Sequence, residues 1–169
     1  LSSTNRVGIH FGNAEFELQS FDLFVRDAET SATTPPTAVA PFDAAAAKAH
    51  QEAWAKYLGE PVVTTNSIGM QLAVIPPGKF MMGDGDNLVD VTLTRPFRLG
   101  VHEVAQGQWK EVMDGAEPWK GQRGVIEGDD VAASYVSWTD AVAFCRRLTD
   151  RERSAGRLQD GWKYRLPTE

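Results

Sequence analysis

The clearest hydrophobic pattern in the chain lies over residues 138–154 and has the spacing of an α-helix. Its apolar positions recur every three or four residues: Ala141, Phe144, Cys145 and Leu148. Ser137 and Asp140 have the spacing of a capping box, and Gly156 follows the last turn. The pattern predicts an amphipathic helix with this stripe buried and with arginines beside it: Arg146, Arg147, Arg151 and Arg153.

Two further helices are indicated. Residues 44–58 are rich in alanine, Asp43 is suited to the N-cap, and Gly59 followed by Pro61 is a stop signal. The larger side chains of this segment share one stripe: His50, Trp54, Tyr57 and Leu58. Residues 104–113 predict a short helix whose inward side chains are Trp109, Val112 and Met113.

Elsewhere the apolar residues come in short runs between turns, which is typical of β-strands. Runs over 70–75 and 79–82 flank Pro76-Pro77-Gly78, a sequence that favours a turn. A strand region over 89–99 is interrupted by Pro96. Later segments predict a loop over 114–134, a strand over 162–166 and a helix start at Thr168-Glu169.

The N-terminal region predicts a β-hairpin, with strands over 6–11 and 15–25 joined at Gly12-Asn13. Because a lone hairpin leaves its apolar face uncovered, we expect it to end a larger sheet that begins upstream. Residues 28–41 have the small polar residues and prolines of an interdomain linker. Both ends of the sequence interrupt an element, so we expect the chain to be a piece of a longer protein.

Composition excludes some classes of partner. Apolar residues make up 42% and charged residues 24% of the 169 residues, as in ordinary soluble proteins. The net charge of −6 argues against nucleic acid and anionic membrane surfaces, both of which attract a basic protein. No apolar run approaches the roughly 20 residues of a membrane span. We therefore expect no nucleic-acid partner and no membrane span.

Few residues suggest chemistry by themselves. His10, His50 and His102 are far apart, and structural or surface roles are favoured over metal binding or base catalysis. Asp84 and Asp86 begin like a calcium loop, but the later ligands and the closing glutamate are missing, so a polar turn is favoured. Asp129-Asp130 could be half of an oxygen-ligand site, but a solvated pair in a loop is favoured.

Cys145 is the single cysteine, and it falls in the middle of its predicted helix. A reactive thiol needs partial exposure and a cationic or helix N-terminal setting, so a buried thiol or half of a disulfide is favoured. The scattered aromatic residues favour core packing over a stacking platform for sugars or bases. We assign no catalytic, cofactor-binding or metal-binding residue from these patterns.

Five short sequence motifs, taken together, point to a protein family more specifically than any single residue does. They are Asn66-Ser67-Ile68-Gly69-Met70, the run from Ile75 to Gly83, the run from Pro96 to Val104, the run from Val136 to Cys145, and the run from Tyr164 to Glu169. In this order and spacing they resemble the N-terminal half of the formylglycine-generating enzyme family, also called sulfatase-modifying factors, over about residues 64–169. The preceding segment 54–59 resembles the lead-in of multidomain bacterial members.

The resemblance implies an α+β fold of the C-type-lectin-like kind, incomplete in this chain. In complete members it implies an oxidoreductase that converts a cysteine of a sulfatase, or of another protein substrate, to formylglycine with oxygen and a copper ion held by two cysteines. Those cysteines and the fold's calcium ligands belong to the C-terminal half of the family domain, beyond Glu169. It therefore implies no catalytic residue and no copper or calcium ligand in this chain, which we expect to be inactive alone. In some members the position of Cys145 is half of a structural disulfide. The alternative is a non-catalytic lectin-like scaffold that binds proteins or glycans.

The N-terminal hairpin, residues 6–25, resembles the final strands of a laminin-G or concanavalin-like jelly roll. This implies a β-sandwich upstream and favours an exported or periplasmic protein. The expected organisation is the end of a β-sandwich over 1–27, a linker and helix over 28–60, and the N-terminal half of a sulfatase-modifying-factor domain over 61–169.

Overall fold

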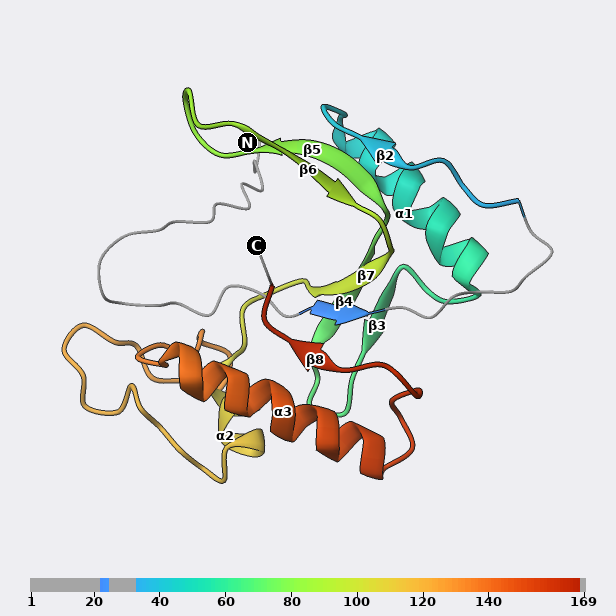
Figure 1. Cartoon of the computed structure of the whole chain (residues 1–169). Coiled ribbons are helices and arrows are strands. Elements are labelled where there is room, and N and C mark those ends of the chain that lie inside the picture. Colours follow the sequence, from blue (N-terminus) through green and yellow to red (C-terminus); the bar gives the residue numbers. More distant parts are fainter. Residues whose placement is uncertain (1–21, 25–32, 168–169) are drawn as a thin grey trace.

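Two small β-sheets and three helices form the part of the chain that the computed structural model describes, residues 22–24 and 33–167 (Figure 1). The antiparallel five-stranded sheet has the order β3 (Val63–Thr65), β4 (Gln71–Ile75), β7 (Phe97–Gly100), β1 (Asp22–Phe24) and β8 (Tyr164–Arg165). The second sheet has the order β2 (Ala38–Val39), β5 (Gly78–Met82) and β6 (Val89–Leu93). The helices are α1 (Ala44–Leu58), α2 (Gln106–Val112) and α3 (Trp138–Ser154). The architecture is mixed α+β, as expected.

The predicted helix over residues 44–58 is confirmed as α1. Asp43 caps it, since its side chain accepts a hydrogen bond of 2.8 Å from the Ala46 amide. The helix ends at Gly59, which takes the left-handed conformation at φ 69°. The next amide, that of Glu60, donates back to the Ala55 carbonyl at 2.9 Å. Both ends are therefore set by local hydrogen bonds that the sequence pattern identifies.

The predicted helix over residues 138–154 is confirmed as α3. Ser137 Oγ accepts from the Asp140 amide at 3.2 Å, and the Asp140 carboxylate accepts from the Ser137 amide at 3.2 Å. The whole predicted stripe is buried: Ala141, Phe144, Cys145 and Leu148. The predicted short helix also forms, as α2, and its Trp109 indole stacks on the Phe144 ring with centroids 5.2 Å apart.

The main core packs α2 and α3 against the five-stranded sheet. Its buried members come from strands, helices and loops: Ile68, Met70, Leu72, Val104, Trp109, Val112, Trp119, Ala133, Val136, Ala141, Phe144, Cys145, Leu148, Trp162 and Tyr164. A smaller cluster joins Trp54 and Ala55 of α1 to Val74 of β4. The aromatic residues in these clusters serve as core residues, as favoured from the sequence.

The predicted strands on either side of Pro76-Pro77-Gly78 both form, but they do not pair with each other. The first, β4, lies in the five-stranded sheet, and the second, β5, lies in the three-stranded sheet. The strand region over 89–99 likewise divides at Pro96 into β6 and β7, one in each sheet. Proline has no amide hydrogen for a ladder, so these prolines mark the points where the chain leaves one sheet for the other.

The N-terminal strand region pairs in a way that the sequence did not indicate. Residues 22–24, expected to belong to an upstream β-sandwich, form β1 between β7 and β8, with Leu23 opposite Arg98 on one side and Tyr164 on the other. The strand over 6–11 and the rest of 15–25 lie outside the described residues, as does the expected helix start at Thr168. The domain boundaries at 27 and 60 stay predictions.

Part of the expected linker is also built into a sheet. Ala38 is buried, and its amide donates to the Pro77 carbonyl at 2.8 Å, while the Ala40 amide donates to Lys79 at 2.9 Å. These bonds form β2, parallel to β5. The composition of this segment did not indicate the strand. A strand of two residues is held by backbone hydrogen bonds and not by a run of apolar side chains.

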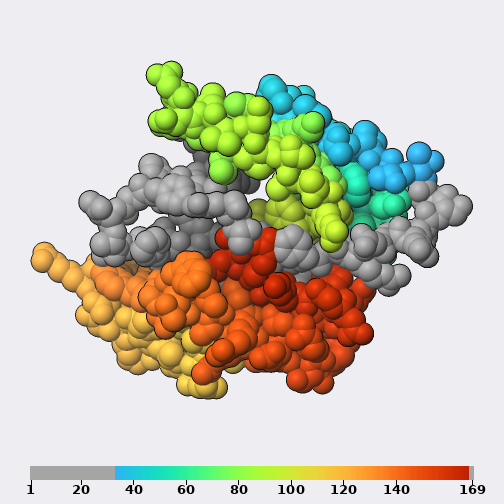
Figure 2. All heavy atoms as spheres, viewed as in Figure 1, coloured from blue at the N-terminus to red at the C-terminus, as the bar shows by residue number. Residues whose placement is uncertain are grey.

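The β5–β6 hairpin projects from the surface beside residues 38–43 (Figure 2). The turn at its tip, residues 83–87, is exposed and polar. Four large apolar side chains near this tip are also exposed: Met81, Met82, Leu88 and Val89. None of the helices in the described part of the chain has the length and apolar character needed to cross a bilayer.

Candidate functional site

The histidines do not come together in the described residues. His50 lies on α1 with its ring 5.6 Å from the ring of Phe42. His102 follows β7 and lines a pocket of about 260 Å³ with Glu103 and Gln108. His10 lies outside the described residues. The described histidines therefore form no shared site.

The two acidic pairs occupy loops. Asp84 and Asp86 lie in the exposed hairpin turn, where the Asp84 carbonyl accepts from the Asn87 amide at 3.0 Å. The Asp129 carboxylate accepts from Lys110 Nζ at 2.6 Å, and this hydrogen bond raises the pKa of the lysine. Within the described residues no group of three or more histidine, cysteine, aspartate or glutamate side chains could hold a metal ion.

Cys145 does not fit the copper site that the family resemblance implies. Its side chain is 3% exposed in the middle of α3, within the main core. A copper ion held by two thiolates needs a second cysteine, and the sequence has one. Calcium needs six or more oxygen ligands, and the described residues offer no such cluster. The residues that the structure describes therefore fit neither a copper nor a calcium ion.

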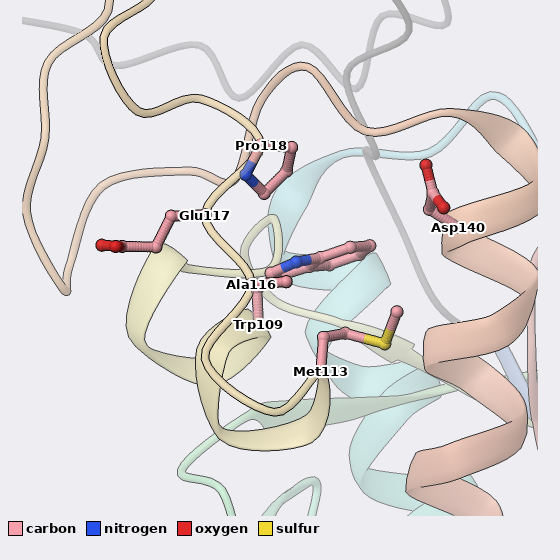
Figure 3. Close-up of a pocket in the computed structure, with 6 residues that line it drawn as sticks. All are labelled: Trp109, Met113, Ala116, Glu117, Pro118 and Asp140. Carbon is pink, nitrogen blue, oxygen red and sulfur yellow. The ribbon is translucent and has the colours of Figure 1, made fainter.

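The described residues do form an open pocket of about 330 Å³ between α2, the segment that follows it and α3. Its lining residues are Trp109, Met113, Ala116, Glu117, Pro118 and Asp140. Figure 3 shows the Trp109 indole at the centre of these residues, with Pro118 and Met113 on either side of it and Asp140, in the first turn of α3, beyond the end of the ring that is opposite its nitrogen. We call this the Trp109 pocket.

The Trp109 indole is held firmly but lacks a polar partner. The side chain is 2% exposed and stacks on Phe144 with an interplanar angle of 10°. No acceptor among the described residues takes a hydrogen bond from its buried Nε1. A buried donor without an acceptor costs about 1–3 kcal/mol, so the packing of this indole on Phe144 must outweigh that cost.

The two carboxylates of the Trp109 pocket differ in their surroundings. Glu117 points away from the indole (Figure 3) and pairs with Lys120 at 2.7 Å, a hydrogen bond that lowers the pKa of the glutamate. Asp140 accepts from Ser137 within the capping box and faces the pocket. Both carboxylates of the pocket therefore already have hydrogen-bond partners within the chain.

A buried polar network joins α3 to the loop before β4. Glu152 is 3% exposed and accepts hydrogen bonds from Ser67 Oγ and from Arg157 Nε, the latter at 3.2 Å. Burial alone would raise the pKa of Glu152, but the hydrogen bonds from Arg157 and Ser67 outweigh it and leave the pKa below its usual value. Nearby, burial raises the pKa of Tyr164, whose hydroxyl accepts from Asn66 Nδ2 at 3.3 Å.

Sequence patterns found some members of these sites but not the sites themselves. Trp109 was expected to face inward and Asp140 to cap α3, yet nothing in the sequence places them on one pocket. Glu152 had a signal that could have identified it. It lies four residues after Leu148, so it continues the buried stripe of α3.

The mixed α+β architecture agrees with the sulfatase-modifying-factor class, which the five sequence motifs resemble. The family model for the sulfatase-modifying factor enzyme 1-like domain matches residues 60–169, more than half of the chain, and the chain belongs to this family. The match confirms the resemblance expected over about 64–169. Comparisons with curated proteins and with solved structures gave no match.

Proposed function

We propose that the chain forms the N-terminal part of a formylglycine-generating domain, in a protein that oxidises a cysteine of a sulfatase or of another protein substrate. The single observation that carries this proposal is the family match over residues 60–169. The proposal includes a C-type-lectin-like fold for the complete domain, a bacterial multidomain parent, and export or a periplasmic location.

In this proposal the chain supplies the framework, and none of its residues takes part in the oxidation. The only thiol is the buried Cys145, so both copper-binding cysteines would come from residues outside these 169. Calcium ligands would come from there as well. The chain alone is therefore expected to leave a substrate peptide unchanged.

The test compares the chain alone with the protein encoded by the complete reading frame. Each is incubated aerobically with copper and a peptide that carries a sulfatase cysteine motif, and the aldehyde product is trapped with a hydrazide and measured by mass spectrometry. We expect conversion by the complete protein and none by the chain alone. Conversion by residues 1–169 alone, or a complete reading frame without a cysteine pair, would overturn the proposal.

Replacement of Cys145 by alanine in the complete protein tests the role of the thiol within the framework. A buried, non-ligating thiol predicts that C145A keeps at least about half of the conversion rate, with some loss of thermal stability from the small cavity. Loss of conversion in a folded C145A protein with reduced copper binding would contradict the framework role. If the complete protein lacks activity altogether, the alternative of a non-catalytic scaffold for proteins or glycans is favoured.

A further inference from the structure

We infer that one face of the β5–β6 hairpin is the surface on which the rest of the domain, the residues that follow Glu169, packs. This inference rests on the proposal that the domain continues beyond this chain. It concerns packing and not the oxidation, so its test is separate from the test of the proposed activity.

The face in question is apolar along its whole length. Side chains alternate between the two faces of a sheet, and the register places Phe80 opposite Val91 and Met82 opposite Val89, so these four lie on one face. Leu93, two positions after Val91, continues the row. We call these five residues the apolar hairpin face.

The opposite face of the hairpin is different. There Lys79 lies opposite Thr92 and Met81 lies opposite Asp90, and all four are exposed. Three of the four are polar or charged. Antiparallel sheets with one apolar and one polar face bury the first and expose the second to water. The pattern therefore predicts that the apolar hairpin face is buried in the finished fold.

The described residues bury this face only in part. Phe80, Val91 and Leu93 are half-buried, whereas Val89 is 58% exposed and Met82 is 40% exposed. In the described part of the chain β6 is also the end strand of its sheet, so no strand pairs with its outer edge there. Exposed apolar side chains beside an open strand edge mark an interaction surface.

The course of the chain after β8 indicates what covers this surface. From β8 the described chain continues to Pro167, and it runs toward the side of the molecule on which the hairpin projects (Figure 1). Residues after Glu169 would therefore start on that side. Because they are covalently attached, their effective concentration at the hairpin is on the order of millimolar, well above that of a second copy in dilute solution.

The test uses two neighbouring methionines that lie on opposite faces of β5. Met81 and Met82 are 51% and 40% exposed in this chain, so hydrogen peroxide should oxidise them at rates within about threefold of each other. In the protein from the complete reading frame we expect Met82 to react at least about fivefold more slowly than Met81, since only Met82 lies on the apolar hairpin face. Mass spectrometry of fragment ions measures the sulfoxide at each position. An unchanged ratio of the two rates, or a reading frame that adds no residues after Glu169, would overturn the inference.

A photo-crosslinker identifies the covering segment. With p-benzoylphenylalanine in place of Val89 in the complete protein, we expect cross-links to residues that follow Glu169. The same group in place of Thr92, on the opposite face, is the control and should give few such cross-links. Capture of residues that precede Leu1, of a second copy of the chain or of another protein would overturn the inference.

A matched pair of variants measures the burial by stability. Val89→Thr keeps the shape of the side chain but replaces a methyl group with a hydroxyl. Because Val89 is exposed in this chain, the melting temperature of the chain alone should change by less than about 2 °C, whereas that of the complete protein should fall by roughly 3–6 °C. Thr92→Ser on the exposed face is the control, with a small change in both proteins. An equal effect of V89T in the two proteins would count against the inference.

The oxidation assay is read separately from these measurements. A complete protein that protects Met82 but forms no formylglycine would support the inference and overturn the proposed activity. Conversion of the substrate peptide by a protein in which Met82 stays as reactive as Met81 would do the opposite.

Discussion

Replacement of Glu152 by glutamine should destabilise the fold by removing a buried charge from its hydrogen-bond network. Glu152 joins three parts of the molecule, because it lies on α3 and accepts from Ser67 before β4 and from Arg157 after α3. Glutamine keeps the length of the side chain but loses the charge, and its amide group brings hydrogens toward the donors of Ser67 and Arg157.

The expected loss can be worked from the two partners. The hydrogen bond from Ser67 to a buried carboxylate contributes about 1.5–3 kcal/mol. The side chain of Arg157 is 47% exposed, so its ion pair is screened by water and adds at most about 1 kcal/mol. Glutamine escapes part of the cost of burying a charge, which offsets some of this loss. We expect a net decrease of about 2 kcal/mol in the free energy of unfolding.

The assay is urea unfolding of the chain followed by circular dichroism. With a slope of about 2 kcal/mol per molar urea, the midpoint should fall by about 1 M at pH 7. Because the pKa of Glu152 is lowered in the folded state, its contribution is fully present above the unfolded pKa of about 4.3 and is lost as the pH falls through the lower folded value. The difference between wild type and E152Q should therefore be constant from about pH 7 to 5 and shrink below about pH 4.

The control for E152Q is Asp150→Asn, two positions earlier on the same helix. The side chain of Asp150 is 67% exposed and its ion pair with Arg153 is long, at 3.9 Å, so D150N should change stability by less than about 0.5 kcal/mol. Equal midpoints for wild type and E152Q at pH 7 would refute the reasoning. A difference that did not shrink at low pH would show that the charge of Glu152 is not its source.

Two further predictions concern positions where the backbone depends on one residue. Ser137→Ala removes the N-cap of α3 and should lower the free energy of unfolding by about 1 kcal/mol, which corresponds to a melting temperature lower by roughly 2–4 °C. The control is Thr139→Ala at an exposed neighbouring position. An equal loss of stability in both variants would contradict the capping role. Gly78→Ala would place a Cβ 2.5 Å from the Ala38 carbonyl oxygen, so we expect faster hydrogen exchange of the Ala40 amide and a cost of about 1–3 kcal/mol. Exposed Lys79→Ala should leave that amide protected, and unchanged exchange in G78A would show that β2 tolerates the extra carbon.

Local signals made the two long helices predictable. The caps at Asp43 and Ser137 and the stop at Gly59 act through hydrogen bonds within a few residues, so the sequence alone located α1 and α3 with the bounds seen in the structure. The positions of most strands were also indicated, but those of β2 and β3 were not. The pairing of the strands was not indicated, because nothing in the sequences of β4 and β5 shows which sheet each strand will join.

The buried polar groups and the Trp109 pocket were not predictable, because their partners are distant in sequence. Ser67 and Glu152 are 85 positions apart, and their contact exists only once α3 has packed against the sheet. Likewise, Trp109 and Asp140 share a pocket because α2 and α3 are brought together through the stacking of Trp109 on Phe144. Hydrophobic periodicity shows which face of a helix turns inward, but not what that face will meet.

The attachment of α1 and β2 has a practical consequence for protein expression. The family match begins at residue 60, yet the Trp54 indole donates to the Pro36 carbonyl at 3.1 Å and Gln51 Nε2 donates to the Val74 carbonyl at 3.0 Å. Cutting the gene at the family boundary would uncover Val74 and leave the edge of β5 open to strands of other molecules. The segment that the family model matches therefore lacks contacts that residues before it make in this structure, and recombinant versions should begin before Pro36.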